Sequence, residues 1–295
     1  MRTRSFPFAA MGSDCLLHLA TEGEAGALAE LAIAEVRRIE RKYSRYRPDS
    51  IVSRINALAG TGEACDCDDE TVALLAYADT LYEASGGLFD ITSGVLRRAW
   101  NFGRQQLPAP GAVEALLPLV DWSSVEWRGG AVRLPMRAME IDFGGFGKEY
   151  AADRAATILA AAGVRHGYVN LGGDLRLVGP QPDGTPWHCA IQHPRHASQL
   201  TASIPLGGGA LATSGDYERF IEVDGQRYCH ILDPRSGQPV CHWQSISVAG
   251  PLAIAAGSCA TIAMLMQQDA LNFLACAGVA YLAIDQHGQC FRKDL

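Results

Sequence analysis

The chain has 295 residues, 48% of them hydrophobic, which is enough to bury a sizeable core in one large domain or two fused lobes. A formal net charge of −7 argues against a broad basic face for nucleic acid, and no apolar run approaches the roughly 20 residues that a membrane-spanning helix needs. Met1–Ala20 lacks the apolar segment of a secretory signal, and nine cysteines without paired CxxC motifs are typical of reduced thiols, so we expect a cytoplasmic protein.

The amino-terminal half predicts strands and long helices. Ser5–Ala20 is typical of two short strands, and Glu24–Arg45 has apolar residues at helical spacing. A second helix is expected over Asp69–Ala84, ended by a glycine pair. Ser123–Phe143 alternates between apolar and polar residues, which predicts further strands.

The carboxy-terminal half predicts a helix after Lys148, ending near Gly163, and then mostly strands. Asp224-Gly225 is a strong hairpin signal between two of these strands. A late helix is expected over Pro251–Met266. The expected strands are His166–Asn170, Leu175–Val178, His188–Gln192, Tyr217–Val223, Tyr228–Leu232, Ser245–Val248, Ala280–Ile284 and Gln289–Arg292. The chain therefore predicts an α+β protein, and we expect one domain over residues 1–295.

The segment DFGGFGKEY, Asp142–Tyr150, is a strand end, a glycine-rich turn and a helix start. Backbone N–H groups at such a turn can converge on an anion, and Lys148 can reach a phosphate. The alternative is a tight connection without a ligand. The spacing of a Walker loop is absent.

Three later segments repeat this theme of glycine turns beside polar side chains. Asn170–Asp174 is either a capped glycine turn or part of a site, and Ala212–Tyr217 follows it. His230, Asp233 and Arg235 then supply a proton acceptor, a carboxylate to orient it and a phosphate-sized cation within six residues. This clustering favours a site over separate structural roles.

Seven ordered blocks, from about Met11 to Met266, resemble the ApbE family of FAD:protein FMN transferases. The blocks are MGS (11–13), YSRY (43–46) with SRIN (53–56), GLFDIT (87–92), DFGGFGK (142–148) with Asp153, NLGGD (170–174), TSGDY (213–217) and HILDPRSG (230–237). The resemblance implies a two-lobed α+β fold with mixed β-sheets flanked by helices and a cleft for FAD between the lobes. It also implies that FAD is cleaved with magnesium, and that FMN is transferred to a Thr or Ser hydroxyl of a target flavoprotein while AMP is released.

The same blocks imply site residues. Lys148, Asp216 and His230 would carry the catalysis, with His230 as the base. The residues expected to bind FAD are Met11, Tyr43, Asn56, Phe89, Asp90, Lys148, Asp153, Gly172, Gly173, Asp174, Thr213, Ser214, His230 and Arg235. The metal would be held by the carbonyl of Gly147 and by Thr261.

The metal site departs from the family pattern, which usually has Ala-Asp-Ala-x-x-Thr on the late helix. Here Gly257 stands at the aspartate position, and Glu149 stands where the family usually has glycine after the lysine. Because magnesium prefers charged oxygen ligands, loss of a carboxylate would weaken its binding. Three outcomes stay open: Glu149 substitutes as a metal ligand, the protein binds or carries FAD without transferring FMN, or the site performs another reaction such as FAD hydrolysis.

A more remote alternative is a general metal-free hydrolase or a structural protein on the same scaffold. Cys229, beside His230, could be a nucleophile. The competing interpretation is that Cys229 is a strand residue facing away from His230, because neighbouring strand residues point to opposite faces.

Overall fold

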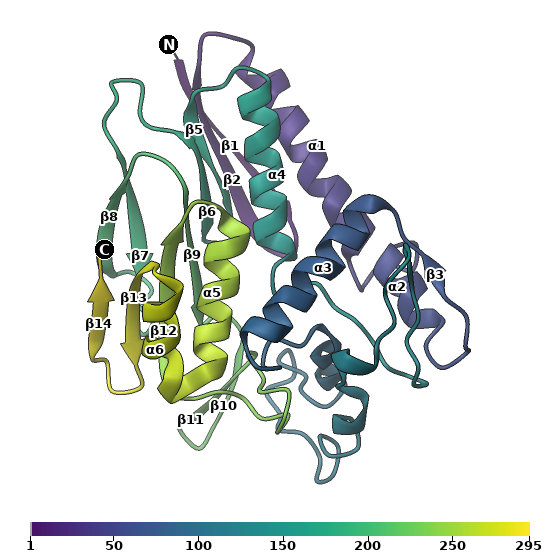
Figure 1. The fold of residues 1–295 in the computed structure, drawn as a ribbon. Coiled ribbons are helices and arrows are strands. Elements are labelled where there is room, and N and C mark those ends of the chain that lie inside the picture. Colours follow the sequence, from purple (N-terminus) through teal and green to yellow (C-terminus); the bar gives the residue numbers. More distant parts are fainter. Residues whose placement is uncertain (1) are drawn as a thin grey trace.

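The computed structural model describes residues 2–295 and is built around one eight-stranded sheet (Figure 1). Its strand order is β1-β2-β5-β6-β9-β12-β13-β14. The strands are β1 (Arg2–Ala10), β2 (Ser13–Thr21), β5 (His166–Leu171), β6 (Asp174–Gly179), β9 (Ala210–Gly215), β12 (Trp243–Gly250), β13 (Ala280–Asp285) and β14 (Cys290–Lys293). Every pairing in this sheet is antiparallel, so the α+β class is confirmed, while the mixed pairing expected for the sheet is wrong.

Three helices cover one face of the sheet: α1 (Ala25–Tyr43), α4 (Gly147–Ala161) and α5 (Ala253–Met266). Helix α5 consists almost entirely of small and apolar residues, so it packs between α4, β9 and β12. The short helix α6 (Ala270–Ala277) packs against α5. Apolar side chains of these helices and of the facing strand positions form the main core.

The opposite face of the sheet is covered by a hairpin of β7 (Trp187–Gln192) and β8 (Leu200–Leu206). Its residues Cys189, Ile191 and Ile204 form a second core with sheet residues such as Leu177 and Leu211. Leu211 belongs to this core while its neighbours Ala210 and Ala212 belong to the main one, as the alternation of side chains along a strand requires.

A smaller group of elements lies beside the sheet and forms a second lobe (Figure 1). It contains α2 (Ile51–Ala57), α3 (Asp69–Ala84) and the two-residue strands β3 (Cys65–Asp66) and β4 (Ala131–Val132). A separate hairpin is formed by β10 (Phe220–Val223) and β11 (Gln226–Cys229). Its turn is Asp224-Gly225, and both residues have positive φ, as this tight turn requires.

The largest error of the sequence predictions is Ser123–Phe143. Apart from β4, an isolated bridge between Glu126 and Arg133 and one 3₁₀ turn, this segment is irregular. Its alternating apolar residues anchor a winding segment to the core instead of forming one face of a sheet; they include Val125, Val132, Leu134, Met139 and Ile141. In the described residues, no helix is long and apolar enough to cross a membrane.

Candidate active site

Lys148 is the central charge of the candidate site and lies in the first turn of α4. Its Nζ is 2.7 Å from Oδ2 of Asp174 and donates to the carbonyl of Gly172 at 3.4 Å. Burial alone would lower the pKa of the Lys148 ammonium, but the carboxylates of Asp174 and Glu149 outweigh it, and this pKa is raised. Lys148 is therefore a fixed cation at the amino end of a helix, where backbone N–H groups also favour an anion.

The turn between β5 and β6 has a shape that only glycine allows. Gly172 and Gly173 have φ angles of 58° and 97°. A Cβ on Gly172 would lie 2.7 Å from the side chain of Ser13 and 3.6 Å from Nζ of Lys148. The Asn170 side chain accepts a hydrogen bond from the Gly173 amide at 2.9 Å. The sequence signal of a glycine turn beside a capping side chain thus marks a close approach of backbone to Lys148.

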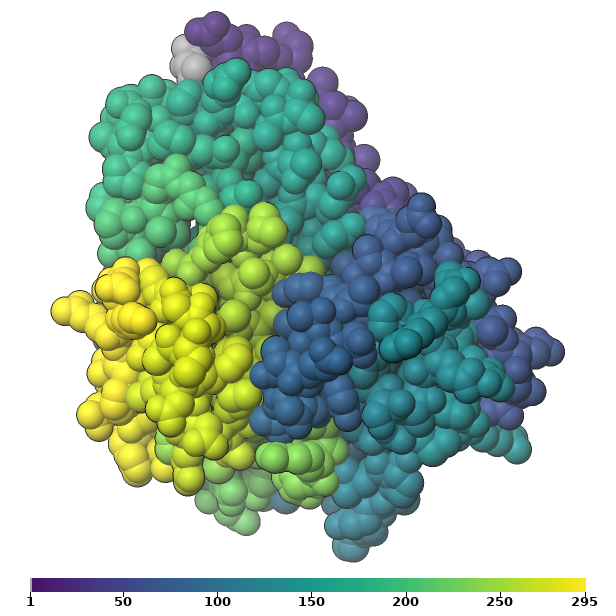
Figure 2. All heavy atoms as spheres, viewed as in Figure 1, coloured from purple at the N-terminus to yellow at the C-terminus, as the bar shows by residue number. Residues whose placement is uncertain are grey.

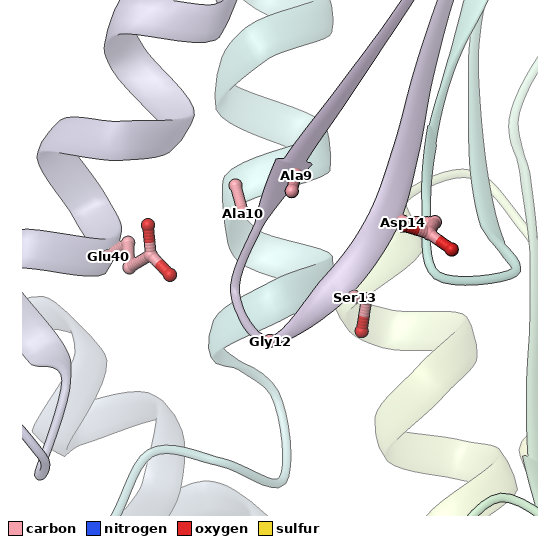
Figure 3. Close-up of a pocket in the computed structure, with 6 residues that line it drawn as sticks. All are labelled: Ala9, Ala10, Gly12, Ser13, Asp14 and Glu40. Atoms are coloured by element: carbon pink, nitrogen blue, oxygen red, sulfur yellow. The ribbon is translucent and has the colours of Figure 1, made fainter.

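The turn between β1 and β2 reaches the same place. Met11 has a φ of 56°, which is uncommon for a residue with a side chain, and its amide donates to Oε1 of Glu40 at 2.6 Å. Figure 3 shows the Glu40 carboxylate directed at this turn, beside an open cavity of about 430 Å³. The cavity is lined by Ala9, Ala10, Gly12, Ser13, Asp14 and Glu40.

Strand β9 links Asp174 to helix α5 through hydrogen bonds of two neighbouring residues. Oδ1 of Asp174 accepts a hydrogen bond from the amide of Thr213 at 3.2 Å. One residue further along β9, the Ser214 hydroxyl is 2.8 Å from that of Thr261. The structure therefore brings together predicted residues from α4, β6, β9 and α5.

Helices α4 and α5 are joined by Asp153, whose two carboxylate oxygens accept hydrogen bonds from the amides of Ala253 and Ile254 at 2.9 Å each. Arg176 also pairs with Asp153 at 2.9 Å. These contacts cap the first turn of α5, which has no capping side chain of its own. Asp153, expected to bind FAD, is thus used within the fold.

Glu149 is buried against Gly257, and its environment fits a bound magnesium ion. Its Oε2 has no hydrogen-bond partner, and burial together with the nearby charge of Asp174 raises the pKa of this carboxyl. Glu149, the Thr261 hydroxyl and the Gly147 carbonyl offer the hard oxygen donors that magnesium prefers. Within residues 2–295 no cluster of three or more His, Cys, Asp or Glu side chains is placed to hold a metal, so carbonyl and hydroxyl oxygens are needed to complete such a site.

His230 follows β11, and its amide donates to the carbonyl of Arg219 at 3.0 Å. Its Nδ1 is buried with no hydrogen-bond partner. Burial, with the positive charges of Arg219 and Lys148, lowers the pKa of His230 to about 4. His230 is therefore a neutral imidazole at neutral pH, able to accept a proton. Burial raises the pKa of the neighbouring Cys229 thiol to about 12, which argues against a nucleophilic role for that cysteine.

The expected orientation of His230 by Asp233 is wrong. Asp233 accepts hydrogen bonds from the Arg235 side chain at 2.9 and 3.1 Å, and Nδ1 of His230 receives none. The short spacing between Asp233 and Arg235 favours this local pair within the turn. The Arg235 side chain is 67% exposed.

Asp216 is held by an arginine that the sequence reasoning missed. Arg195 donates two hydrogen bonds to its carboxylate, at 2.7 and 2.6 Å. Arg195 lies in the loop between β7 and β8, 21 residues away in the chain, so no local pattern could pair the two. The bidentate geometry fixes this loop against the end of β9.

Four of the residues expected to bind FAD use their polar or aromatic groups inside the second lobe and its junction with the sheet. Both ends of the Asn56 amide bond the backbone of Ile141, at 2.8 and 3.0 Å. Asp90 accepts hydrogen bonds from Thr92 and Trp122, while the Tyr43 hydroxyl is 3.3 Å from that of Thr71.

Phe89 packs beneath the glycine-rich turn, where a Cβ on Gly145 would lie 2.7 Å from its ring. These four residues support the loops around the site. Among the other residues expected to bind FAD, Met11 and Gly172 are half-buried and Gly173 is exposed to solvent. Tyr46, absent from the predicted set, is 75% exposed. Its hydroxyl accepts from Arg45 at 2.9 Å, and Arg45 pairs with Asp142 at the start of the glycine-rich turn.

The antiparallel α+β fold and the half-buried lysine beside its carboxylates define a protein suited to binding a phosphate-bearing ligand. A sequence profile of the ApbE family matches residues 11–283, and the chain belongs to that family. It is 28% identical over 282 residues to FAD:protein FMN transferase of Klebsiella pneumoniae (strain 342), covering 92% of this chain and 80% of that protein.

Two solved structures show the same fold. The crystal structure of the ApbE protein from Thermotoga maritima has a TM-score of 0.91 at 29% identity, covering 99% of this chain and 97% of that one. Apo flavinyl transferase ApbE from Pseudomonas stutzeri has a TM-score of 0.87 at 29% identity, covering 99% and 95%. The resemblance stated from the sequence is confirmed, and with it the transferase class.

Proposed function

We propose that this protein binds FAD, cleaves its pyrophosphate and transfers FMN to a Thr or Ser hydroxyl of a target flavoprotein, releasing AMP. The observation that carries the proposal is the pair formed by the half-buried Lys148 at the start of α4 and the buried Asp174, beside the glycine turn of β5 and β6. The name FAD:protein FMN transferase, given to the relatives from Klebsiella pneumoniae and Rhodobacter capsulatus, supports it.

Lys148 and the first backbone amides of α4 would bind the pyrophosphate. Phosphoryl transfer demands that charge on the phosphate oxygens be neutralised, and a lysine fixed by a carboxylate does this without reorganising. Around it, Met11, Gly172 and Gly173 would allow close approach of the ligand, and Thr213 and Ser214 would line the reacting end. The exposed Arg235 would contact a phosphate only after releasing Asp233.

His230 would accept the proton of the attacking hydroxyl. The imidazole is neutral at physiological pH, and its Nδ1 makes no competing hydrogen bond. An anionic pyrophosphate beside Lys148 and Arg219 would offset the two cations that lower the pKa of His230. Its basicity would therefore rise when substrate is bound.

The oxygen donors that would hold magnesium are Glu149, Thr261 and the carbonyl of Gly147. The ion, when bound, would neutralise charge on the pyrophosphate oxygens and favour attack at phosphorus. Asp216 would act by positioning Arg195, because both oxygens of its carboxylate accept hydrogen bonds from that side chain.

The test is incubation of the protein with FAD and a threonine-bearing acceptor domain, in magnesium and in EDTA, with AMP measured by chromatography and FAD binding by flavin fluorescence. The proposal expects FAD binding in both, and AMP release that depends on magnesium. A Lys148→Met variant should lose FAD affinity, whereas a Lys293→Met control should not. Comparable AMP in EDTA would contradict the metal-dependent reaction.

A second candidate function is FAD binding or carriage without transfer. Gly257 favours it, because the late helix offers no carboxylate of its own. Tight FAD binding with no AMP in magnesium would identify this alternative, and AMP without protein-bound flavin would identify a pyrophosphatase.

A further inference from the structure

Glu149 and Gly257 occupy one shared space between helices α4 and α5. A Cβ built on Gly257 would lie 2.7 Å from Cγ, 2.8 Å from Oε1 and 3.0 Å from Cδ of Glu149. Real Cβ atoms essentially never approach other atoms below 3.0 Å, so any side chain at position 257 would displace the Glu149 carboxylate. The two positions are therefore sterically coupled.

We propose that Glu149 supplies the carboxylate of a divalent-cation site and that Gly257 is the residue that makes room for it. The role of this cation rests on the proposed function, because the cation would assist the cleavage of FAD. Binding of the cation itself does not depend on that function. In this chain the carboxylate is on the first turn of α4, and the glycine is on α5.

The contact follows from how the helices are joined. Asp153 on α4 bonds the amides of Ala253 and Ile254 on α5. One helical turn back from Asp153 is Glu149, and one turn forward from Ala253 is Gly257, so antiparallel helices place these two opposite each other. One further turn along α5 is Thr261, on the same face as Gly257.

One oxygen of the buried Glu149 carboxyl has no protein partner. The residue is only 8% exposed, and its Oε2 makes no hydrogen bond. The nearest cation, Lys148, already pairs with Asp174 at 2.7 Å. A buried carboxylate is costly unless a cation or hydrogen-bond donors compensate it. Asp174 is close enough to act on Glu149, and Thr261 lies one helical turn beyond Gly257 on α5. Such oxygen groups are the ligands that a hard divalent ion such as Mg²⁺ or Mn²⁺ prefers.

The first experiment titrates the protein with Mn²⁺ alone and follows free Mn²⁺ by electron paramagnetic resonance. Glu149→Gln keeps the shape and removes the charge, and it should lower Mn²⁺ affinity by at least about tenfold. The matched control is Glu140→Gln, a carboxylate that pairs with Arg97 and Arg98. Equal affinity of wild type and Glu149→Gln would overturn the proposal, as would a wild type that does not bind Mn²⁺.

The second experiment tests the steric coupling. Gly257→Ala should push the Glu149 carboxylate aside and lower Mn²⁺ affinity, whereas Gly26→Ala on α1, where a Cβ would meet nothing within 4 Å, should not. The double variant Glu149→Gly with Gly257→Asp should recover affinity that Glu149→Gly alone has lost. A folded double variant that binds no better than Glu149→Gly would overturn the exchange.

FAD binding in EDTA, measured by flavin fluorescence, separates this proposal from the proposed function. Glu149→Gln should bind FAD as the wild type does when no metal is present. Loss of Mn²⁺ binding with FAD binding intact supports the cation site whether or not FMN is transferred. Absent FAD binding in the wild type would instead contradict the proposed function.

Discussion

The carboxylate of Asp153 holds the backbone of Ala253, at 2.9 Å, across the interface of α4 and α5. A second hydrogen bond from Asp153 to the next amide completes the cap. This contact decides which residues of the two helices face one another, and hence the position of Thr261 relative to Lys148. Asp153, which the family blocks suggested for FAD binding, thus sets how helices α4 and α5 are aligned along each other.

Asp153→Ala should lower the free energy of unfolding by about 2–4 kcal/mol, because it removes two charge-assisted hydrogen bonds and leaves Arg176 without its partner. Urea unfolding measures the change. Asp66→Ala, at an exposed position on β3, should stay within about 0.5 kcal/mol of the wild type. A stability of Asp153→Ala equal to that of the control would contradict the capping role.

His230 should give an unusual pH dependence. In the free protein its pKa is lowered to about 4, so the neutral imidazole persists from neutral pH down to that value. The acid limb of kcat/KM attributable to His230 should therefore lie near pH 4 to 5, below the ordinary histidine range, and the limb of kcat should lie higher because bound pyrophosphate favours protonation.

His230→Gln should lower kcat by about 10²- to 10⁴-fold with FAD binding retained. His188→Gln, at an exposed position of β7, is the control. If kcat of His230→Gln matches the control, another group accepts the proton.

The Met11 turn should depend on Glu40. Glu40→Ala removes the acceptor of the Met11 amide and should weaken FAD binding by about 1–3 kcal/mol, because the uncommon φ of Met11 loses its support. Adding Met11→Gly should recover part of this loss, since glycine adopts this conformation freely. Fluorescence titration with FAD measures both affinities, with Glu30→Ala at an exposed position as the control. Unchanged affinity in Glu40→Ala would show that the turn keeps its conformation without the Glu40 carboxylate.

The loop between β7 and β8 should be released when Arg195 is replaced. Arg195→Ala removes both hydrogen bonds to Asp216, so amide exchange in residues 193–199 should become at least about tenfold faster, equal to ~1.4 kcal/mol. Hydrogen–deuterium exchange followed by mass spectrometry measures it. Arg165→Ala serves for comparison, and identical protection of the loop in both variants argues against the fixing role.

Where local signals agree, the sequence predicts the fold well. Helix α3 begins after Asp68, which caps it, and ends before Gly86-Gly87, as the sequence indicated. The same holds for the Asp224-Gly225 hairpin. The alternation of apolar and polar residues gives a wrong prediction over Ser123–Phe143. An irregular segment that buries single apolar side chains at intervals produces the same two-residue period as a strand. The elements α2, α6, β8 and β9 were missed because they are short or rich in small and polar residues.

The site is less predictable than the fold, because a block of residues typical of a family can contain both residues that line the site and residues that only support its loops. Lys148 and Asp174 meet as the blocks implied, while Asn56 and Asp90 support loops. The contact between Glu149 and Gly257 joins positions more than 100 residues apart, and no spacing rule connects them. The family pattern suggested Glu149 as a substitute for the carboxylate missing at Gly257, and the packing of α4 on α5 adds that the two residues are in contact.

Transfer of FMN can be measured by intact mass spectrometry of a threonine-bearing acceptor domain after incubation with the protein, FAD and magnesium. We expect a mass gain of one FMN, less one water, on that threonine, with AMP in equal amount and no gain in a Thr→Ala acceptor. An acceptor of unchanged mass in the presence of AMP, or no AMP at all although FAD is bound, would contradict the proposed transfer.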